Sequence, residues 1–284
     1  MVQMSALDTH SFLETILHYK RTVELPDHKA SVSDRTIRER AEAVRSPAQA
    51  LATSLLRSDG HVALIAEIKR ASPSKGILVK GTLNPAELAK RYAEAGASAI
   101  SVLTDERFFM GTTTDLQDVH RAVSVPVLRK DFIVEPYQVY EARSIGADAV
   151  LLIVAALEDT QLADLYKLAL SLTLTPLVEV HNERETERAM HLGARVIGVN
   201  NRDLNTFQTN LSTTERCAKL VHSHTSSTVL VSESGIYTAQ DVHQMAAMGV
   251  HAVLVGESII TSNDIAGQVR ALSSVMRTSL KKEA

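Results

Sequence analysis

The stretch Glu94-Ala-Gly-Ala-Ser-Ala-Ile100 contains the pattern that decides the fold. A helical segment ends at a glycine, which can adopt the left-handed conformation that closes a helix, and a buried strand follows. The same design returns in Ser144-Ile-Gly-Ala-Asp-Ala-Val150, His191-Leu-Gly-Ala-Arg-Val-Ile197 and Met248-Gly-Val-His-Ala-Val253. The copies are roughly 50 residues apart, which is about the length of two strand–helix units of a parallel α/β barrel.

Short apolar segments rich in β-branched residues alternate with amphipathic segments along the chain, and the glycine pattern precedes every second one. We predict eight strands, at Val62–Ile68, Ala99–Leu103, Val127–Arg129, Ala149–Val154, Leu177–Val180, Val196–Val199, Val229–Val231 and Ala252–Val255. Helical patterns lie between them, for example at Pro85–Ala95 and Pro136–Ile145, where a proline in the first turn costs no hydrogen bond. Apolar strands that alternate with helices indicate a parallel sheet covered by helices. The predicted fold class is α/β, a (β/α)8 TIM barrel, with a doubly wound open sheet as the alternative.

The first 60 residues show no strand signal and are predicted to form an N-terminal helical extension. Apolar residues recur at helical spacing between Phe12 and Leu17, and Ser11 with Glu14 can form a capping box. Pro26 is expected to end this first helix, and a charged second helix follows at 33–44. We expect residues 1–60 to pack on a barrel of residues 61–284, with one domain overall.

Composition narrows the possible classes of protein. The net charge of −3 gives no general attraction to nucleic acid or to an anionic membrane, so an anionic ligand needs a local site. The single cysteine, Cys217, excludes an internal disulfide and a cysteine-rich zinc site. Residues 1–13 do not resemble a secretory signal, and no apolar run reaches the ~18 residues of a membrane helix. A cytoplasmic enzyme without membrane or nucleic-acid partners is expected.

Ionisable and amide side chains follow six of the predicted strands, at the end where such barrels carry their chemistry. They are Glu67 and Lys69, Lys130 and Asp131, Glu179 and His181, Asn200 and Arg202, Glu233 and Ser234, and Glu257. Glu67 and Lys69 are two residues apart at the end of the first predicted strand, so their side chains should point to the same face of the sheet. One such group is compatible with a structural ion pair, but six together favour a functional cavity.

Glycines follow the seventh and eighth strands, where this architecture usually binds phosphate through backbone N–H groups. Ser234-Gly235 and Gly256-Glu257-Ser258 are the candidate residues, and Ser72 and Ser74 can add donors from the first strand.

Motifs for other chemistries are missing. The sequence contains no Gly-x-Gly-x-x-Gly, phosphate-binding loop, Gly-x-Ser-x-Gly or His-Glu-x-x-His motif. His222 and His224 are expected on a surface helix without metal, and Cys217 as a helix residue that is not a nucleophile. His181 is expected to hydrogen-bond to a neighbouring group and not to act in catalysis itself.

Several long motifs in the same order resemble those of the indole-3-glycerol-phosphate synthase family. They extend over the chain to about Ile259 and comprise Ile65–Gly76 (IAEIKRASPSKG), Ala99–Asp105 (AISVLTD), Leu128–Phe132 (LRKDF), Ala147–Ile153 (ADAVLLI), Val178–His181 (VEVH), Gly198–Leu204 (GVNNRDL) and Ser232–Ile236 (SESGI). The resemblance implies a monofunctional carboxy-lyase that needs no cofactor or metal. The implied substrate is 1-(2-carboxyphenylamino)-1-deoxyribulose 5-phosphate, a sugar phosphate that carries an anthranilate group, and the implied pathway is tryptophan biosynthesis.

The resemblance also implies roles for residues in general acid/base catalysis. Lys130 is the general acid at the ribulose carbonyl, Lys69 a second cation, Glu179 the group that stabilises positive charge, and Glu67 an acid or base in dehydration. How these four groups divide the proton transfers stays open, because close groups titrate together.

Further residues are implied to bind substrate. Asn200 and Ser234 complete the implied catalytic set and position the hydroxyl and carboxyl groups of the substrate, and Arg202 holds the anthranilate carboxylate. An apolar lining is implied for Phe109, Phe132 and Leu204, and phosphate binding for Ser72, Gly235, Gly256, Glu257 and Ser258. The N-terminal helix is expected to lie over the barrel mouth, and the chain is expected to be a monomer.

Two rival functions stay open from the sequence. One is another phosphate-binding barrel enzyme, such as phosphoribosylanthranilate isomerase or the tryptophan synthase α subunit, which should lack the Lys69/Lys130 pair with Glu67. The other is a catalytically silent barrel that binds a sugar phosphate as a scaffold or regulator.

Overall fold

A closed parallel β-barrel forms the centre of the protein. The computed structural model describes residues 11–46, 48–79, 81–204, 206–224 and 227–278. In this part of the chain eight strands close the barrel in the order β1-β10-β9-β8-β7-β6-β5-β4, and β4 pairs back to β1. The strands are β1 (Ala63–Ile68), β4 (Ala99–Leu103), β5 (Val127–Lys130), β6 (Ala149–Ile153), β7 (Thr175–Val180), β8 (Val196–Asn200), β9 (Val229–Glu233) and β10 (Ala252–Val255).

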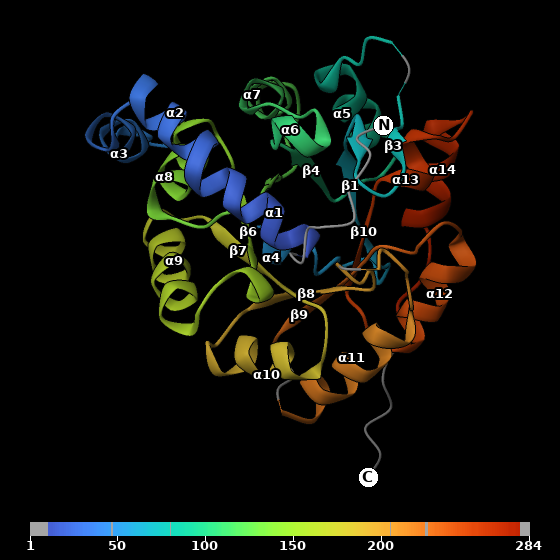
Figure 1. Cartoon of the computed structure of the whole chain (residues 1–284). Coiled ribbons are helices and arrows are strands. Elements are labelled where there is room, and N and C mark those ends of the chain that lie inside the picture. Colours follow the sequence, from blue (N-terminus) through green and yellow to red (C-terminus); the bar gives the residue numbers. More distant parts are fainter. Residues whose placement is uncertain (1–10, 47, 80, 205, 225–226, 279–284) are drawn as a thin grey trace.

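Helices surround the barrel and bury its outer face (Figure 1). They are α5 (Pro85–Glu94), α6 (Glu106–Phe109), α7 (Thr113–Ala122), α8 (Pro136–Ser144), η2 (Val154–Ala156), α9 (Asp159–Ser171), α10 (Glu183–His191), α11 (Ser212–His224), α12 (Ala239–Ala247), α13 (Glu257–Ile260) and α14 (Ile265–Ser273). Most residues of the barrel strands are buried, as expected for a parallel sheet covered on both faces.

The predicted (β/α)8 barrel is confirmed, and every predicted strand is present to within two residues at each end. The glycines of the repeated pattern, Gly96, Gly146, Gly193 and Gly249, have φ values of 111°, 92°, 77° and 79°. They end α5, α8, α10 and α12 in the left-handed conformation that the sequence predicted.

The N-terminal extension is helical, but Pro26 does not end its first helix. α1 (Phe12–Tyr19) is capped by the predicted Ser11/Glu14 capping box and continues through a π-helix, η1 (Lys20–Glu24), into α2 (Leu25–Ser31). Because the wider π turn brings the Leu25 N–H to the Lys20 carbonyl, the chain enters α2 with Pro26 in its first turn, where no N–H is required. The prediction that Pro26 is a stop was therefore wrong.

The extension lies against the barrel. α3 (Asp34–Ala43) packs on α8, a short helix α4 (Leu51–Ser54) follows, and α1 crosses in front of the barrel strands in Figure 1. Leu13, Leu17 and Leu25 belong to the same buried apolar cluster as the barrel strands.

The sequence also missed a small hairpin directly after β1. β2 (Ala71–Ser72) and β3 (Gly76–Ile77) pair as antiparallel strands. Segments of two residues are too short to show a periodic pattern, so periodicity could not reveal them.

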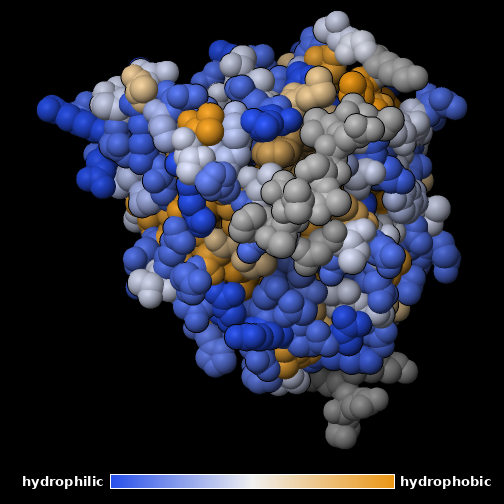
Figure 2. Space-filling model, viewed as in Figure 1, coloured by the Kyte–Doolittle hydropathy of each residue, from blue (hydrophilic) through white to orange (hydrophobic). Residues whose placement is uncertain are grey.

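The visible face of the molecule is mostly hydrophilic, with scattered hydrophobic residues (Figure 2). Among the helices of the described ranges, none has both the length and the apolar character of a membrane span.

Candidate active site

A cavity of about 150 Å³ opens at the carboxyl ends of the barrel strands. All residues that the sequence singled out as site candidates line it except Ser258, and Ser74 and Asp131 line it too. The Ser258 hydroxyl instead donates to the Ile236 carbonyl at 3.3 Å, because this side chain lies in the first turn of α13 and turns away from the cavity. The sequence predicted phosphate binding through backbone N–H groups at Gly256-Glu257-Ser258, so the role of Ser258 stays a prediction.

Lys130 lies at the centre of a buried charge cluster. Its ammonium donates to Glu179 Oε2 at 3.0 Å and lies 3.6 Å from Glu233 Oε2. Lys130 and Glu233 are the last residues of β5 and β9, and Glu179 is the next-to-last residue of β7. Closure of the barrel therefore brings the three side chains together. Glu179 and Glu233 are each 1% exposed, which makes their interaction with Lys130 stronger than a surface ion pair.

The environment separates the proton affinities of the two carboxylates. Burial alone would raise the pKa of Glu179, but the charge of Lys130 and the hydrogen bond from His181 outweigh it and hold that pKa well below its usual range. Burial raises the pKa of Glu233 to about 8, since Lys130 opposes this only in part and Glu179 and Glu67 reinforce it. The cluster therefore moves the proton affinities of its two carboxyl groups in opposite directions, an arrangement typical of acid/base sites.

The charge of Lys130 itself is strongly favoured. Burial would lower its pKa, but the carboxyl groups of Glu179, Glu233 and Glu67 raise it above the ordinary lysine value. The ammonium is thus a fixed positive charge directed into the cavity.

A second ion pair lies in the same cavity at the end of β1, which only β4 separates from β5. Lys69 Nζ donates to Glu67 Oε1 at 2.7 Å, and both side chains are largely buried. Gly256, at the end of β10, makes room for this pair, because a Cβ there would lie 2.6 Å from Glu67 Oε1 and 3.2 Å from Lys69 Nζ. Gly198 plays the same part for Glu233, whose Oε1 would lie 2.1 Å from a Cβ at that position.

Asn200 and His181 hold Glu179 from the side opposite Lys130. Asn200 Nδ2 donates to Glu179 Oε1 at 3.3 Å, and His181 Nε2 lies 3.3 Å from the same oxygen. Burial would lower the pKa of His181, but Glu179 and Glu185 raise it to about 10, so the ring is a cation at neutral pH. The expectation that His181 hydrogen-bonds to a neighbouring group is confirmed by its Nδ1, which lies 3.0 Å from Glu185 Oε2.

The Arg202 guanidinium makes two contacts with neighbouring groups of the protein. Its Nη1 donates to the Phe207 carbonyl at 3.0 Å, and its Nη2 lies 3.8 Å from Glu257 Oε2. Its guanidinium lines the cavity with its position fixed by these two contacts.

The end of β9 has an unusual backbone. Ser234 has φ 64° and Gly235 φ 77°, and a non-glycine residue in the left-handed region carries strain. Asn201, 2% exposed, holds this turn, because its Nδ2 donates to Ser232 Oγ and to the carbonyls of Glu233 and Ser234. Strain that the surroundings enforce is a common feature of functional sites.

Apolar and aromatic side chains complete the cavity. The rings of Phe109 and Phe132 lie 6.2 Å apart between centroids, and Leu204 lines the wall nearby. Phe12 of α1 covers the cavity and packs edge-on against Phe207 at 5.2 Å. The predicted position of the N-terminal helix over the barrel mouth is confirmed.

The candidate set drawn from the sequence omitted Glu233, Phe12 and Asn201. Glu233 was visible as a polar residue at a strand end, but only its distance to Lys130 distinguishes it from a structural carboxylate. No sequence signal shows that Phe12 covers the cavity or that Asn201 holds the next strand.

The described residues contain no group of three or more His, Cys, Asp or Glu side chains suited to a metal ion. The observed arrangement can bind an anionic, partly aromatic molecule and exchange protons with it.

Comparisons with known proteins agree with this geometry. A family model described as "Indole-3-glycerol phosphate synthase" matches residues 13–272. The chain is 50% identical over 268 residues to an indole-3-glycerol phosphate synthase of Roseiflexus sp., an alignment that covers 92% of this chain and 98% of the relative. It is 46% identical over 251 residues to that of Leifsonia xyli subsp. xyli, covering 85% and 95% of the two chains. A thiamine phosphate pyrophosphorylase structure from Pyrococcus furiosus shares only the fold, with a TM-score of 0.56, 15% identity, and coverage of 78% of this chain and 96% of that one.

Proposed function

Because this chain belongs to the indole-3-glycerol phosphate synthase family, we propose that it closes the indole ring in tryptophan biosynthesis. Its substrate is 1-(2-carboxyphenylamino)-1-deoxyribulose 5-phosphate, and its products are indole-3-glycerol phosphate, carbon dioxide and water. The observation that carries the proposal is the meeting of the Lys130–Glu179 and Lys69–Glu67 pairs in one cavity with an aromatic wall.

The reaction explains why such residues are needed. The aromatic carbon that carries the carboxylate attacks the ribulose carbonyl, whose oxygen takes up a proton and becomes a hydroxyl. Loss of carbon dioxide returns an electron pair to the ring. The hydroxyl then leaves as water after protonation, and a proton is removed from the neighbouring CH₂ to form the indole double bond. Each stage requires a positioned acid or base.

Lys130 is the general acid at the carbonyl in this proposal. Its ammonium is held charged above all by Glu179, so a proton is in place when substrate binds. Glu179 stabilises the positive charge that develops on the aniline nitrogen, and Lys69 with Glu67 serves the dehydration at the end of β1.

The remaining residues bind and orient the substrate. Arg202 interacts with the anthranilate carboxylate, Asn200 and the Ser234 hydroxyl position polar groups, and Phe109 and Phe132 lie against the ring. Phosphate binding is assigned to the loops that carry Ser72, Gly235, Gly256, Glu257 and Ser258, with Ser258 contributing only its backbone amide.

The wider setting also belongs to the proposal. We propose that the chain acts in the cytoplasm as a monomer, without nucleic acid. Residues 1–60 and 61–284 are proposed to fold as one domain, supported by the apolar cluster that contains both Leu13 and the barrel strands.

A turnover assay tests the function directly. The purified protein is given the open-chain substrate, and the fluorescence of the indole product is followed. Lys130→Met should reduce kcat by about 10³-fold and leave substrate affinity measurable, since a general acid contributes 10²–10⁴-fold. Lys90→Met, at a surface ion pair with Glu87, is the matched control and should behave as the parent. Absence of product with the parent protein would favour the rival phosphate-binding barrels or a silent barrel, and full turnover by Lys130→Met would remove its assignment.

A further inference from the structure

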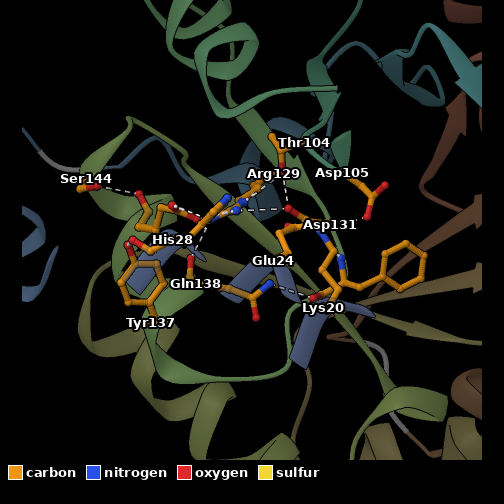
Figure 3. A network of polar contacts seen from close by, with 12 residues as sticks. Lys20, Glu24, His28, Thr104, Asp105, Arg129, Asp131, Tyr137, Gln138 and Ser144 are labelled. Carbon is orange, nitrogen blue, oxygen red and sulfur yellow. Dashed lines mark hydrogen bonds and ion pairs between the residues drawn. The ribbon is translucent and has the colours of Figure 1, made fainter. Parts of the chain in front are cut away.

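A fully buried lysine connects the N-terminal extension to the barrel. Lys20, at the first position of η1, is 0% exposed. Its ammonium lies 2.5 Å from Glu24 Oε1, 3.0 Å from Asp105 Oδ2 and 2.7 Å from Asp131 Oδ1, and these contacts are seen together in Figure 3. None of these residues belongs to the catalytic set proposed above.

The cluster continues along β5. Arg129, 1% exposed, lies 3.1 Å from Asp131 Oδ2 (Figure 3). It also lies 2.7 Å from Glu141 Oε2 on α8. His28 of α2 lies 3.3 Å from the other oxygen of Glu141. Lys20 and Arg129 are thus shared among four carboxyl groups from four segments of the fold, Glu24, Asp105, Asp131 and Glu141.

The charges are strongly coupled. Burial alone would lower the pKa of Lys20, but Asp131, Asp105 and Glu24 outweigh it and raise that pKa above the ordinary value. Burial would raise the pKa of Asp131, yet Lys20 and Arg129 hold it well below its usual range. Removal of Lys20 leaves Asp105 and Asp131 buried with too little positive charge.

Lys130 lies between Arg129 of β5 and Asp131, which directly follows the strand. Asp131 Oδ2 accepts from the Thr104 hydroxyl at 2.5 Å, and Asp131 Oδ1 accepts from the Phe132 amide at 2.8 Å. The carbonyl of Lys130 itself accepts from the Thr104 amide at 3.2 Å. The backbone that follows Lys130 is therefore fixed by groups that meet at Asp131.

From this geometry we infer that Lys20 is a positioning residue for ring closure, which fixes the end of β5 through Asp131 and so sets the place of the Lys130 ammonium. This inference rests on the proposed function. The extension then contributes to the reaction in two separate ways: Phe12 covers the cavity, and Lys20 orders the catalytic strand end.

Two physical arguments favour positioning over simple stabilisation. Buried ion clusters add little net stability compared with apolar side chains of similar size, because desolvation is costly. Lys20 also begins a π-helix, a rare geometry that occurs frequently at functional sites.

The test compares three variants of the full chain. Lys20→Met should lower kcat by about 10²-fold, the cost of a displacement of about 1 Å at a reacting group, with KM within about a factor of three of the parent. Asp105→Asn keeps the Lys20–Asp131 pair but removes one anchor, and should lower kcat by about tenfold. Lys29→Met is the matched control, because Lys29 also joins the extension to the barrel, through Glu135 at 2.6 Å, and has no contact with β5.

Turnover is measured at a temperature where circular dichroism shows each variant folded. If Lys20→Met is not folded at any assay temperature, Asp105→Asn decides the outcome. A lower melting temperature with parental kcat in the folded variants would overturn the inference, as would an equal loss of kcat in Lys29→Met.

A crystal structure of Lys20→Met separates this inference from the proposed function. We expect Lys130 Nζ to leave its 3.0 Å contact with Glu179, and an unmoved Lys130 would overturn the inference. Because this readout needs no substrate, it decides the positioning role even if the parent protein does not form the indole product.

Discussion

Gly256 offers a sharp perturbation of the site, because a single added methyl group would meet a catalytic pair. A Cβ at this position would lie 2.6 Å from Glu67 Oε1, 3.1 Å from Glu67 Cβ and 3.2 Å from Lys69 Nζ. Its φ of −126° lies outside the left-handed region that favours glycine, so the main effect we expect from Gly256→Ala is the added bulk.

The size of the effect follows from these distances. Ordinary van der Waals contact begins at about 3.4 Å, so Glu67 Oε1 must move by roughly 0.8 Å. The flexible end of the Glu67 side chain can make this movement at small cost in stability, but it moves away from its 2.7 Å contact with Lys69. A displacement of about 1 Å at a reacting group corresponds to a loss of about 10²-fold in kcat.

Fluorescence of the indole product gives kcat and KM, and circular dichroism gives Tm. Gly193→Ala is a control that adds backbone strain without a steric clash. The φ of 77° strains an alanine by about 1 kcal/mol, but no heavy atom lies within 4 Å of the position of the added Cβ. We expect Gly256→Ala to lose turnover with a Tm near that of the parent, and Gly193→Ala to lose stability with parental kcat.

The reasoning would be refuted if Gly256→Ala kept full kcat. It would also be wrong if KM rose steeply at constant kcat, because the methyl group would then obstruct phosphate binding and leave the Glu67–Lys69 pair in place.

Three further predictions concern stability, pH and substrate binding. Asn201→Ala should lower the free energy of unfolding by about 2–4 kcal/mol in urea titrations, because it leaves the buried Thr214 amide and the end of β9 without partners. Burial and the nearby charge of Arg277 lower the pKa of His251 to about 4, so the unfolded chain binds more protons than the fold between pH 6.5 and 4. The free energy of unfolding should therefore decrease as the pH is lowered from 6.5 to 4. His251→Asn, which can still accept from the Leu230 amide, should make this decrease smaller, and an equal slope in the variant and the parent would contradict the prediction. Phe12→Ala should raise KM by about tenfold with little change in kcat, since it removes an aromatic contact over the cavity, and an unchanged KM would exclude that contact from binding.

Local patterns were sufficient for the barrel. The left-handed glycines that end α5, α8, α10 and α12 are conformational requirements of single residues, and the apolar strands that follow them are buried whichever neighbours they pair with. Since parallel strands joined by helices carry their functional groups at one end, the alternation also indicated where Glu67, Lys130 and Glu179 would gather.

Local patterns were misleading where a residue's role depends on distant groups. The missing N–H of Pro26 predicts the end of a helix. Instead, a π turn that begins at the buried Lys20 leads directly into α2, which has Pro26 in its first turn. The direction of the Ser258 side chain, toward the Ile236 carbonyl, is also not visible in the sequence, because the start of α13 sets it.

The sequence by itself determined the barrel, its helical extension and the end of the barrel that holds the charged residues, because periodicity and glycine conformation act over a few neighbouring residues. Only the tertiary structure decided that Glu233 shares Lys130 with Glu179, that Gly256 leaves space for Glu67, and that Lys20 of the extension reaches Asp131. These relations join residues from separate strands and helices, and burial there shifts the proton affinities of the carboxyl groups.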